Sequence, residues 1–166
     1  MKHNLSFNTV VVVFLLLACA FVLLPRVAAH AATHVSHYAA HAAVSCSGDG
    51  CNGLDPSQTG CDDARAYTAQ TAIIKDYAGN QIGLVELRFS PTCGTNWTRE
   101  TSYVNNAYNQ PSVHRIYDGL IEYGYGKNTV EWSDMVYAPD ANSAWGEGCI
   151  TMPDGASQYC AETPIG

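Results

Sequence analysis

The first group of side chains that could do chemistry is a set of four histidines with helical spacing. They are separated by four, three and four residues: His30, His34, His37 and His41. On a helix they would lie along one face, where neutral imidazoles bind zinc, copper or nickel. The surrounding segment, 30–45, is almost all Ala, His, Ser, Thr and Val, which is too poor in large apolar residues to fold alone. We therefore predict a tail or linker without a metal, and keep metal binding by these histidines as an alternative.

The second group consists of carboxylates near the later predicted strands, namely Glu122, Glu131 and Asp134. Two carboxylates at a suitable separation can hydrolyse glycosides, but spacing in the sequence does not set that distance. Most charged side chains are simply solvated. The only histidine beyond the His-rich segment is His114, and the chain has no Gly-x-Ser-x-Gly motif. We therefore assign no catalytic residue and expect a protein that is not an enzyme, with a glycosidase-like extracellular hydrolase as the alternative.

The third group consists of six cysteines that follow the N-terminal apolar segment: Cys46, Cys51, Cys61, Cys93, Cys149 and Cys160. An even number of cysteines in an exported chain indicates a disulfide framework. No Cys-x2-Cys pair is present, and an oxidising compartment works against zinc sites built from thiolates. The cysteines therefore predict three disulfides and no cofactor.

The N-terminus has the layout of a secretory signal. Lys2 precedes an apolar run from Val10 to Leu24, and small residues at 27–31 suit a signal peptidase. The run is short for a membrane-spanning helix. We predict that residues 1–29 form a helical signal segment that is removed, so that the mature protein is secreted. An uncleaved anchor is the alternative, and it would be the protein's only membrane contact.

Loss of residues 1–29 would leave an acidic protein. Six basic and fifteen acidic side chains would remain, a formal net charge of −9. Such a surface repels phosphate backbones and anionic lipid headgroups. We therefore expect neither nucleic acid nor an anionic membrane surface as a partner.

Residues 46–166 have the pattern of one mainly β domain. Residues 82–90 alternate, with Val85, Leu87 and Phe89 on one face, as in a strand with one buried side. The other expected strands are 67–75, 97–103, 113–117, 120–125, 129–132, 135–137, 145–152 and 158–161. Residues 105–112, rich in Asn, Gln and Pro, are predicted to form a loop. The fold expected is a small antiparallel β-barrel or sandwich-like domain stapled by disulfides.

The predicted hairpin indicates one disulfide. A turn near residues 78–79 places Tyr67 opposite Phe89 or Ser90, and continuing the register brings Cys61 towards Cys93. The two further pairs expected are a local Cys46–Cys51 bridge and a Cys149–Cys160 clamp across the last turn. Six cysteines allow 15 pairings, so other connectivities stay open.

Aromatic residues are concentrated in the middle of the chain. Tyr123 and Tyr125 would point to one face of an extended segment, and Trp132 follows shortly after. Exposed aromatic rings stack on sugars or hold peptides, so we predict that these three residues bind a ligand. Packing in the core is the alternative, because strands favour aromatic residues.

One motif suggests a relative: Cys46-x-Gly48-x2-Cys51-x-Gly53-x-Asp55-Pro56-x2-Thr59-Gly60-Cys61, followed by Val85-Glu-Leu-Arg-Phe-Ser90, Cys93, Trp97 and Arg99. Over about residues 46–100 this pattern resembles the YjfA-like family of secreted bacterial proteins, domain of unknown function 2690. The resemblance implies export from a bacterium, a compact β-rich domain and no assigned enzymatic activity. It also implies that the first four cysteines pair among themselves. The leading hypothesis is a secreted domain that binds an envelope or environmental ligand, a carbohydrate or a peptide.

Overall fold

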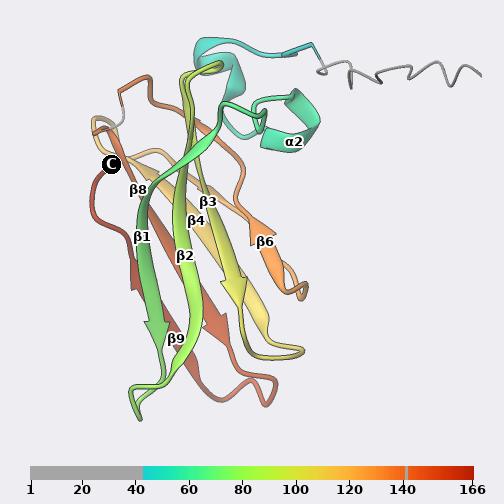
Figure 1. Cartoon of the computed structure of the whole chain (residues 1–166), viewed down its shortest axis with the longest axis vertical. Helices are drawn as coiled ribbons and strands as arrows, with labels where there is room; N and C mark the ends of the chain where they lie inside the picture. The colour runs from blue at the N-terminus through green and yellow to red at the C-terminus, as the bar shows by residue number, and fades with distance from the viewer. Residues whose placement is uncertain (1–42, 141) are drawn as a thin grey trace, which may run out of the picture. The chain divides into compact units, whose positions relative to one another are not determined.

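The computed structural model describes residues 43–140 and 142–166 (Figure 1). The predicted signal segment and the four histidines of the His-rich segment lie outside the described residues. Within the described part of the chain, no helix is long and apolar enough to cross a membrane.

The domain is a sandwich of two antiparallel sheets (Figure 1). The five-stranded sheet has the order β1-β2-β3-β6, and β7 also pairs with β3; its strands are β1 (Tyr67–Lys75), β2 (Gln81–Ser90), β3 (Thr95–Ser102), β6 (Val130–Trp132) and β7 (Val136–Tyr137). The four-stranded sheet has the order β5-β4-β8-β9; its strands are β5 (Ile121–Tyr123), β4 (Tyr108–Arg115), β8 (Ala144–Thr151) and β9 (Gln158–Glu162). The predicted mainly β fold is therefore confirmed, as a sandwich.

Alternation in β2 positions the core as the sequence predicts. Val85 and Leu87 are fully buried between the sheets, where they pack with residues of the four-stranded sheet such as Ile150 and Val113. Tyr67 pairs with Phe89, which confirms the expected register of the first hairpin.

The predicted loop at 105–112 is correct for residues 105–107 and wrong beyond them, because β4 already begins at Tyr108. Its polar residues are held by partners far away in the sequence. The Asn109 side-chain amide donates to the carbonyl of Asn128 at 2.6 Å, and the Asn109 backbone exchanges hydrogen bonds with Gly126. Pro111 lacks an N–H, but its carbonyl accepts a hydrogen bond from the Gly124 N–H at 2.8 Å. Tertiary hydrogen bonds therefore override the local turn preferences of this segment.

The segment before β1 covers one end of the outer face of the five-stranded sheet. It contains two single helical turns, η1 (Gly48–Cys51) and α2 (Pro56–Thr59). Asp55 caps α2 by accepting hydrogen bonds from the N–H groups of the second and third residues of the turn, at 2.7 and 2.9 Å. The segment buries Trp97 of β3 completely, against Met135 and the cysteines.

The three predicted disulfides are confirmed: Cys46–Cys51, Cys61–Cys93 and Cys149–Cys160. The Cys61–Cys93 bridge joins the covering segment to the end of the β2–β3 hairpin. The Cys149–Cys160 bridge joins two directly opposite residues of β8 and β9. Each bridge contributes about 2–4 kcal/mol to a small domain.

Candidate functional site

The outer face of the four-stranded sheet carries several polar and aromatic side chains that could bind a ligand or take part in a reaction. Val113 of β4 and Ile150 of β8 point into the core, so their sequence neighbours point outwards. The register places Ser112 between Tyr123 of β5 and Glu147 of β8. This outer face also carries Gln110, His114, Trp145, Cys149, Cys160 and Glu162.

Three tyrosines form a row along one edge of this face, and we call them the tyrosine row: Tyr108, Tyr123 and Tyr125. Tyr108 and Tyr125 lie 6.4 Å apart between ring centroids with an interplanar angle of 21°. Tyr123 and Tyr125 lie 6.1 Å apart at 13°. All three are exposed, Tyr125 to 58%. The prediction that Tyr123 and Tyr125 share a face is confirmed, and the fold adds Tyr108, which sequence reasoning assigned to a loop.

Glycine allows the chain to hold the tyrosine row in place. A Cβ at Gly124 would overlap the Trp132 carbonyl oxygen, so only glycine lets the two segments approach this closely. The Tyr123 carbonyl also accepts a hydrogen bond from the Asp134 N–H at 3.2 Å. The backbone between the rings is therefore fixed by its packing on the following strand.

Ser112, His114 and Glu147 form a polar cluster beside the tyrosine row. The Ser112 hydroxyl lies 3.0 Å from His114 Nε2 and 3.4 Å from a Glu147 carboxylate oxygen. The His114 ring stacks on Trp145 with centroids 3.7 Å apart. Burial lowers the pKa of His114, although the nearby Glu147 and Glu162 carboxylates oppose this effect. The imidazole is therefore mostly neutral at pH 7.

This cluster does not have the geometry of a nucleophilic triad. In a triad the hydroxyl and the carboxylate bind opposite nitrogens of the histidine ring. Here His114 Nε2 contacts both, since it also lies 3.7 Å from the Glu147 carboxylate. Ser112 is in addition only 3% exposed. The cluster is instead a set of side chains that contact one another on the outer face of the sheet.

Trp132 does not join the tyrosine row. It lies on β6 of the five-stranded sheet, opposite Arg99 of β3, and is exposed. Among the described residues its ring makes no aromatic contact with Tyr123 or Tyr125. The three residues predicted to bind a ligand are therefore divided between the two sheets.

The three candidate carboxylates also separate. Burial raises the pKa of Glu122, and the Asp134 carboxylate raises it further, so these two acids are neighbours. The pKa of Asp134 is likewise raised, by burial and by Asp55. Glu131 instead pairs with Glu100 across β6 and β3 and accepts hydrogen bonds from Asn128. Any chemistry that needs two acids would use Glu122 with Asp134 and not Glu131.

Glu100 is a buried carboxyl that sequence reasoning missed. It lies between the sheets with no exposed surface, and its Oε2 accepts a hydrogen bond from the Gln110 N–H at 3.1 Å. Its Oε1 has no hydrogen-bond partner among the described residues. Burial raises the pKa of Glu100 to about 8. The polar sequence of β3 gives no sign of this burial, because only pairing with β2 and β6 turns the residue inwards.

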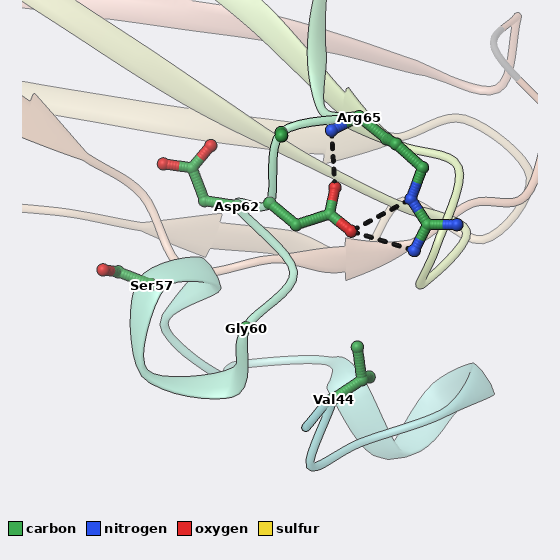
Figure 2. Close-up of a pocket in the computed structure, with 7 residues that line it drawn as sticks. Val44, Ser57, Gly60, Asp62 and Arg65 are labelled. Atoms are coloured by element: carbon green, nitrogen blue, oxygen red, sulfur yellow. Dashed lines mark hydrogen bonds and ion pairs between the residues drawn. The ribbon is translucent and has the colours of Figure 1, made fainter. Parts of the chain in front are cut away.

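A pocket lies beside α2, away from the tyrosine row (Figure 2). Its lining is Val44, Ser57, Gly60, Asp62, Asp63, Ala64 and Arg65. The Asp63 carboxylate already accepts hydrogen bonds from Thr92 at 2.7 Å and from Arg65 at 2.8–3.2 Å. The Thr92 hydrogen bond is the main reason that the pKa of Asp63 falls to about 2. Two of the three charged residues of this lining, Asp63 and Arg65, are therefore already paired with each other.

Fold and site together define a disulfide-bonded β-sandwich with an exposed row of tyrosines on one sheet. The family model described as "Protein of unknown function (DUF2690)" matches residues 49–161, and the chain belongs to this family. The match confirms the resemblance to domain of unknown function 2690 found over residues 46–100 and extends it to residue 161. No curated protein and no solved structure matches the chain.

Proposed function

We propose that this protein is a secreted, non-enzymatic binding domain whose ligand is a carbohydrate chain lying over the tyrosine row. The observation that carries this proposal is the parallel arrangement of three exposed rings, 6.1–6.4 Å apart. Sugar rings present apolar C–H faces to aromatic rings and hydroxyl groups to neighbouring polar side chains. A row of near-parallel rings therefore suits a chain of sugars better than a single small molecule.

The polar groups beside the tyrosine row support the same ligand class. Gln110 provides a partly exposed hydrogen-bonding group on β4, the strand that pairs with β5 of Tyr123. Glu147 and Glu162 lie directly opposite each other across β8 and β9, and like charges in such a pair are unfavourable. Within the four described strands of this sheet, the only cationic residue is Arg115, which is buried in ion pairs. This charge pattern favours a neutral or basic glycan over an acidic one.

Export is part of the proposal. Disulfides persist in oxidising compartments, and three of them hold this small domain. The predicted signal segment at residues 1–29 would supply the route. A binding domain of the cell envelope must stay folded outside the cell, and disulfides stabilise the folded state there.

The test is binding of the purified domain to insoluble chitin, chitosan, cellulose and peptidoglycan. Tyr123→Ala and Tyr125→Ala should each weaken binding about two- to tenfold, since an aromatic stacking contact contributes about 0.5–1.5 kcal/mol. Tyr77→Ala is the matched control, because Tyr77 is 90% exposed and pairs with Tyr159 outside the tyrosine row. Unchanged binding in both tyrosine-row variants would contradict the proposal, as would retention by none of the four polymers.

The same incubations test the hydrolase alternative. Released reducing ends are measured for the wild type and for Glu122→Gln, because Glu122 has a raised pKa and Asp134 as a neighbour. Polysaccharide turnover that is lost in this variant would replace the binding proposal with a glycosidase. Binding to a panel of immobilised peptides tests the other ligand class. Binding to peptides but to none of the polysaccharides would contradict the proposal of a carbohydrate ligand.

A further inference from the structure

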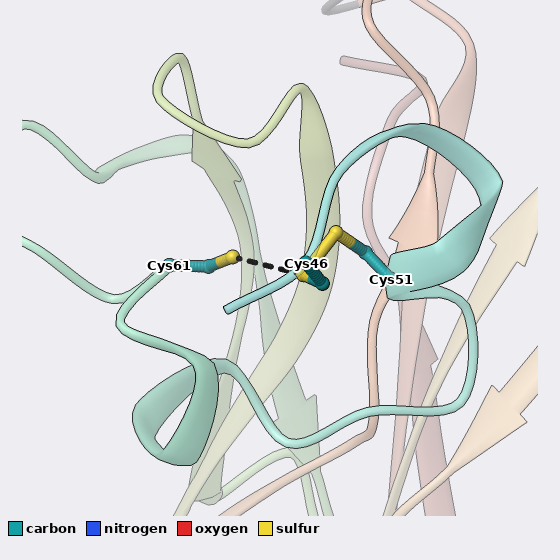
Figure 3. A group of neighbouring side chains, drawn as sticks. All are labelled: Cys46, Cys51 and Cys61. Atoms are coloured by element: carbon teal, nitrogen blue, oxygen red, sulfur yellow. Dashed lines mark hydrogen bonds between the residues drawn. A yellow bond between two sulfur atoms is a disulfide. The ribbon is translucent and has the colours of Figure 1, made fainter. Parts of the chain in front are cut away.

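Two of the three disulfides are in contact with each other (Figure 3). The Cys46 sulfur lies 3.7 Å from the Cys61 sulfur, although Cys46 is bonded to Cys51 and Cys61 to Cys93. The three sulfurs of Cys46, Cys51 and Cys61 all lie within 4.8 Å of one another. Thiol–disulfide exchange requires a thiolate that can reach a disulfide sulfur, and this packing supplies that proximity.

We propose that these two bridges form a thiol–disulfide exchange site that reacts with an external dithiol. Opening of the Cys46–Cys51 bridge would produce a Cys46 thiolate beside Cys61. This thiolate attacks Cys61 and transfers the bridge, so that a Cys46–Cys61 disulfide forms and Cys93 is released. The exchange replaces the Cys61–Cys93 disulfide, which links the covering segment to the sheet, by a Cys46–Cys61 disulfide within the covering segment.

Burial determines where the external dithiol enters. Cys46 is partly exposed, whereas Cys51 and Cys61 are fully buried and Cys93 is 7% exposed. A dithiol thiolate therefore attacks the Cys46 sulfur, and the electron pair of the broken S–S bond leaves on Cys51. The second thiol of the reagent then displaces Cys46. The reagent is oxidised to its disulfide, and Cys46 and Cys51 receive its two electrons and two protons.

The second step is an internal exchange without net oxidation. The Cys46 thiolate forms a bond to Cys61, the Cys61–Cys93 bond breaks, and Cys93 takes the electron pair and a proton. No disulfide then links the covering segment to the five-stranded sheet. Backbone hydrogen bonds remain, such as those of Gly53 and Leu54 with Met135 at 3.0 Å. The exchange therefore loosens the cover over Trp97.

The direct test uses Cys51→Ser, which leaves Cys46 as a free thiol next to the intact Cys61–Cys93 bridge. Samples are alkylated at intervals and their peptides are mapped. We expect the alkylated cysteine to be Cys93 and not Cys46, together with a Cys46–Cys61 disulfide. Cys160→Ser is the matched control. It leaves Cys149 as a free thiol, and among the described residues no third cysteine sulfur lies near it. The alkylated cysteine in this variant should therefore be Cys149 at every time. Label only on Cys46, with Cys61–Cys93 intact at every time, would overturn the proposal.

Limited reduction of the wild-type protein provides a test that does not depend on folding of the variant. One equivalent of dithiothreitol is added, samples are alkylated at intervals, and the labelled cysteines are mapped. Exchange predicts label on Cys51 and Cys93 in the same molecules. Label on Cys46 and Cys51 with Cys61–Cys93 unbroken would refute it. Reduction of the exposed Cys149–Cys160 bridge, which is followed in separate peptides, consumes part of the dithiothreitol, so further equivalents are added until label appears on Cys51.

Discussion

Replacement of the buried Glu100 by glutamine should stabilise the protein, and increasingly so as the pH rises. The carboxyl group lies in the sandwich core, where one oxygen accepts a hydrogen bond from the Gln110 N–H and the other has no partner among the described residues. Glutamine has nearly the same shape and retains an acceptor. The variant removes a charge that the core disfavours.

The magnitude follows from the pKa of Glu100, which burial raises from 4.5 to about 8. The folded state therefore holds a proton that the unfolded chain loses near pH 4.5, so folding stability falls as the pH rises from about 4.5 to about 8. Each pH unit in this window costs about 1.4 kcal/mol, so the total loss is on the order of 4–5 kcal/mol. Above about pH 8 both states are ionised and the loss is complete.

The assay is urea unfolding of the wild type and Glu100→Gln at several pH values from 5 to 8. The difference in unfolding free energy should widen by about 1.4 kcal/mol per pH unit in favour of the variant. His114, Glu122 and Asp134 titrate in both proteins, so their contributions cancel in the difference. Asp154→Asn removes one exposed carboxylate in a turn and controls for net charge. A difference in unfolding free energy between Glu100→Gln and the wild type that stays constant from pH 5 to 8 would refute the reasoning.

Two further predictions concern the packing between the sheets. Gly148→Ala places a Cβ 2.7 Å from Val85 Cγ2 and 3.2 Å from Glu100 Cγ, so it should destabilise the domain by about 1–3 kcal/mol in urea unfolding. Gly50→Ala has open space and should change little, and equal effects of the two variants would contradict this packing. Thr98→Val removes a buried hydrogen bond of 2.7 Å to the Ser112 carbonyl and should cost about 1–3 kcal/mol. The same change at the exposed Thr71 is its control, and a melting temperature of Thr98→Val equal to that of the control would count against this bond.

Part of the site could be predicted because it depends on local alternation. Tyr123 and Tyr125 are two residues apart, so any extended backbone places them on the same side. Trp132 could not be placed in this way. Its strand pairs with β3 in the other sheet, and no local pattern in the sequence specifies which sheet a three-residue strand joins. Tyr108 was missed for the same reason, since its strand is held by distant hydrogen bonds and not by β propensity.

The mainly β class and the register of the first hairpin follow from local patterns in the chain, and the cysteine positions indicated the three cystine pairs while other pairings stayed open. These features follow from alternation, turn residues and cysteine positions, which act over short distances or through one hairpin. The burial of Glu100, the place of Tyr108 in the tyrosine row and the contact between two disulfides become visible only in the folded molecule. Each of these depends on how strands from different parts of the chain are brought together, because burial and contact are properties of packed sheets and not of single strands.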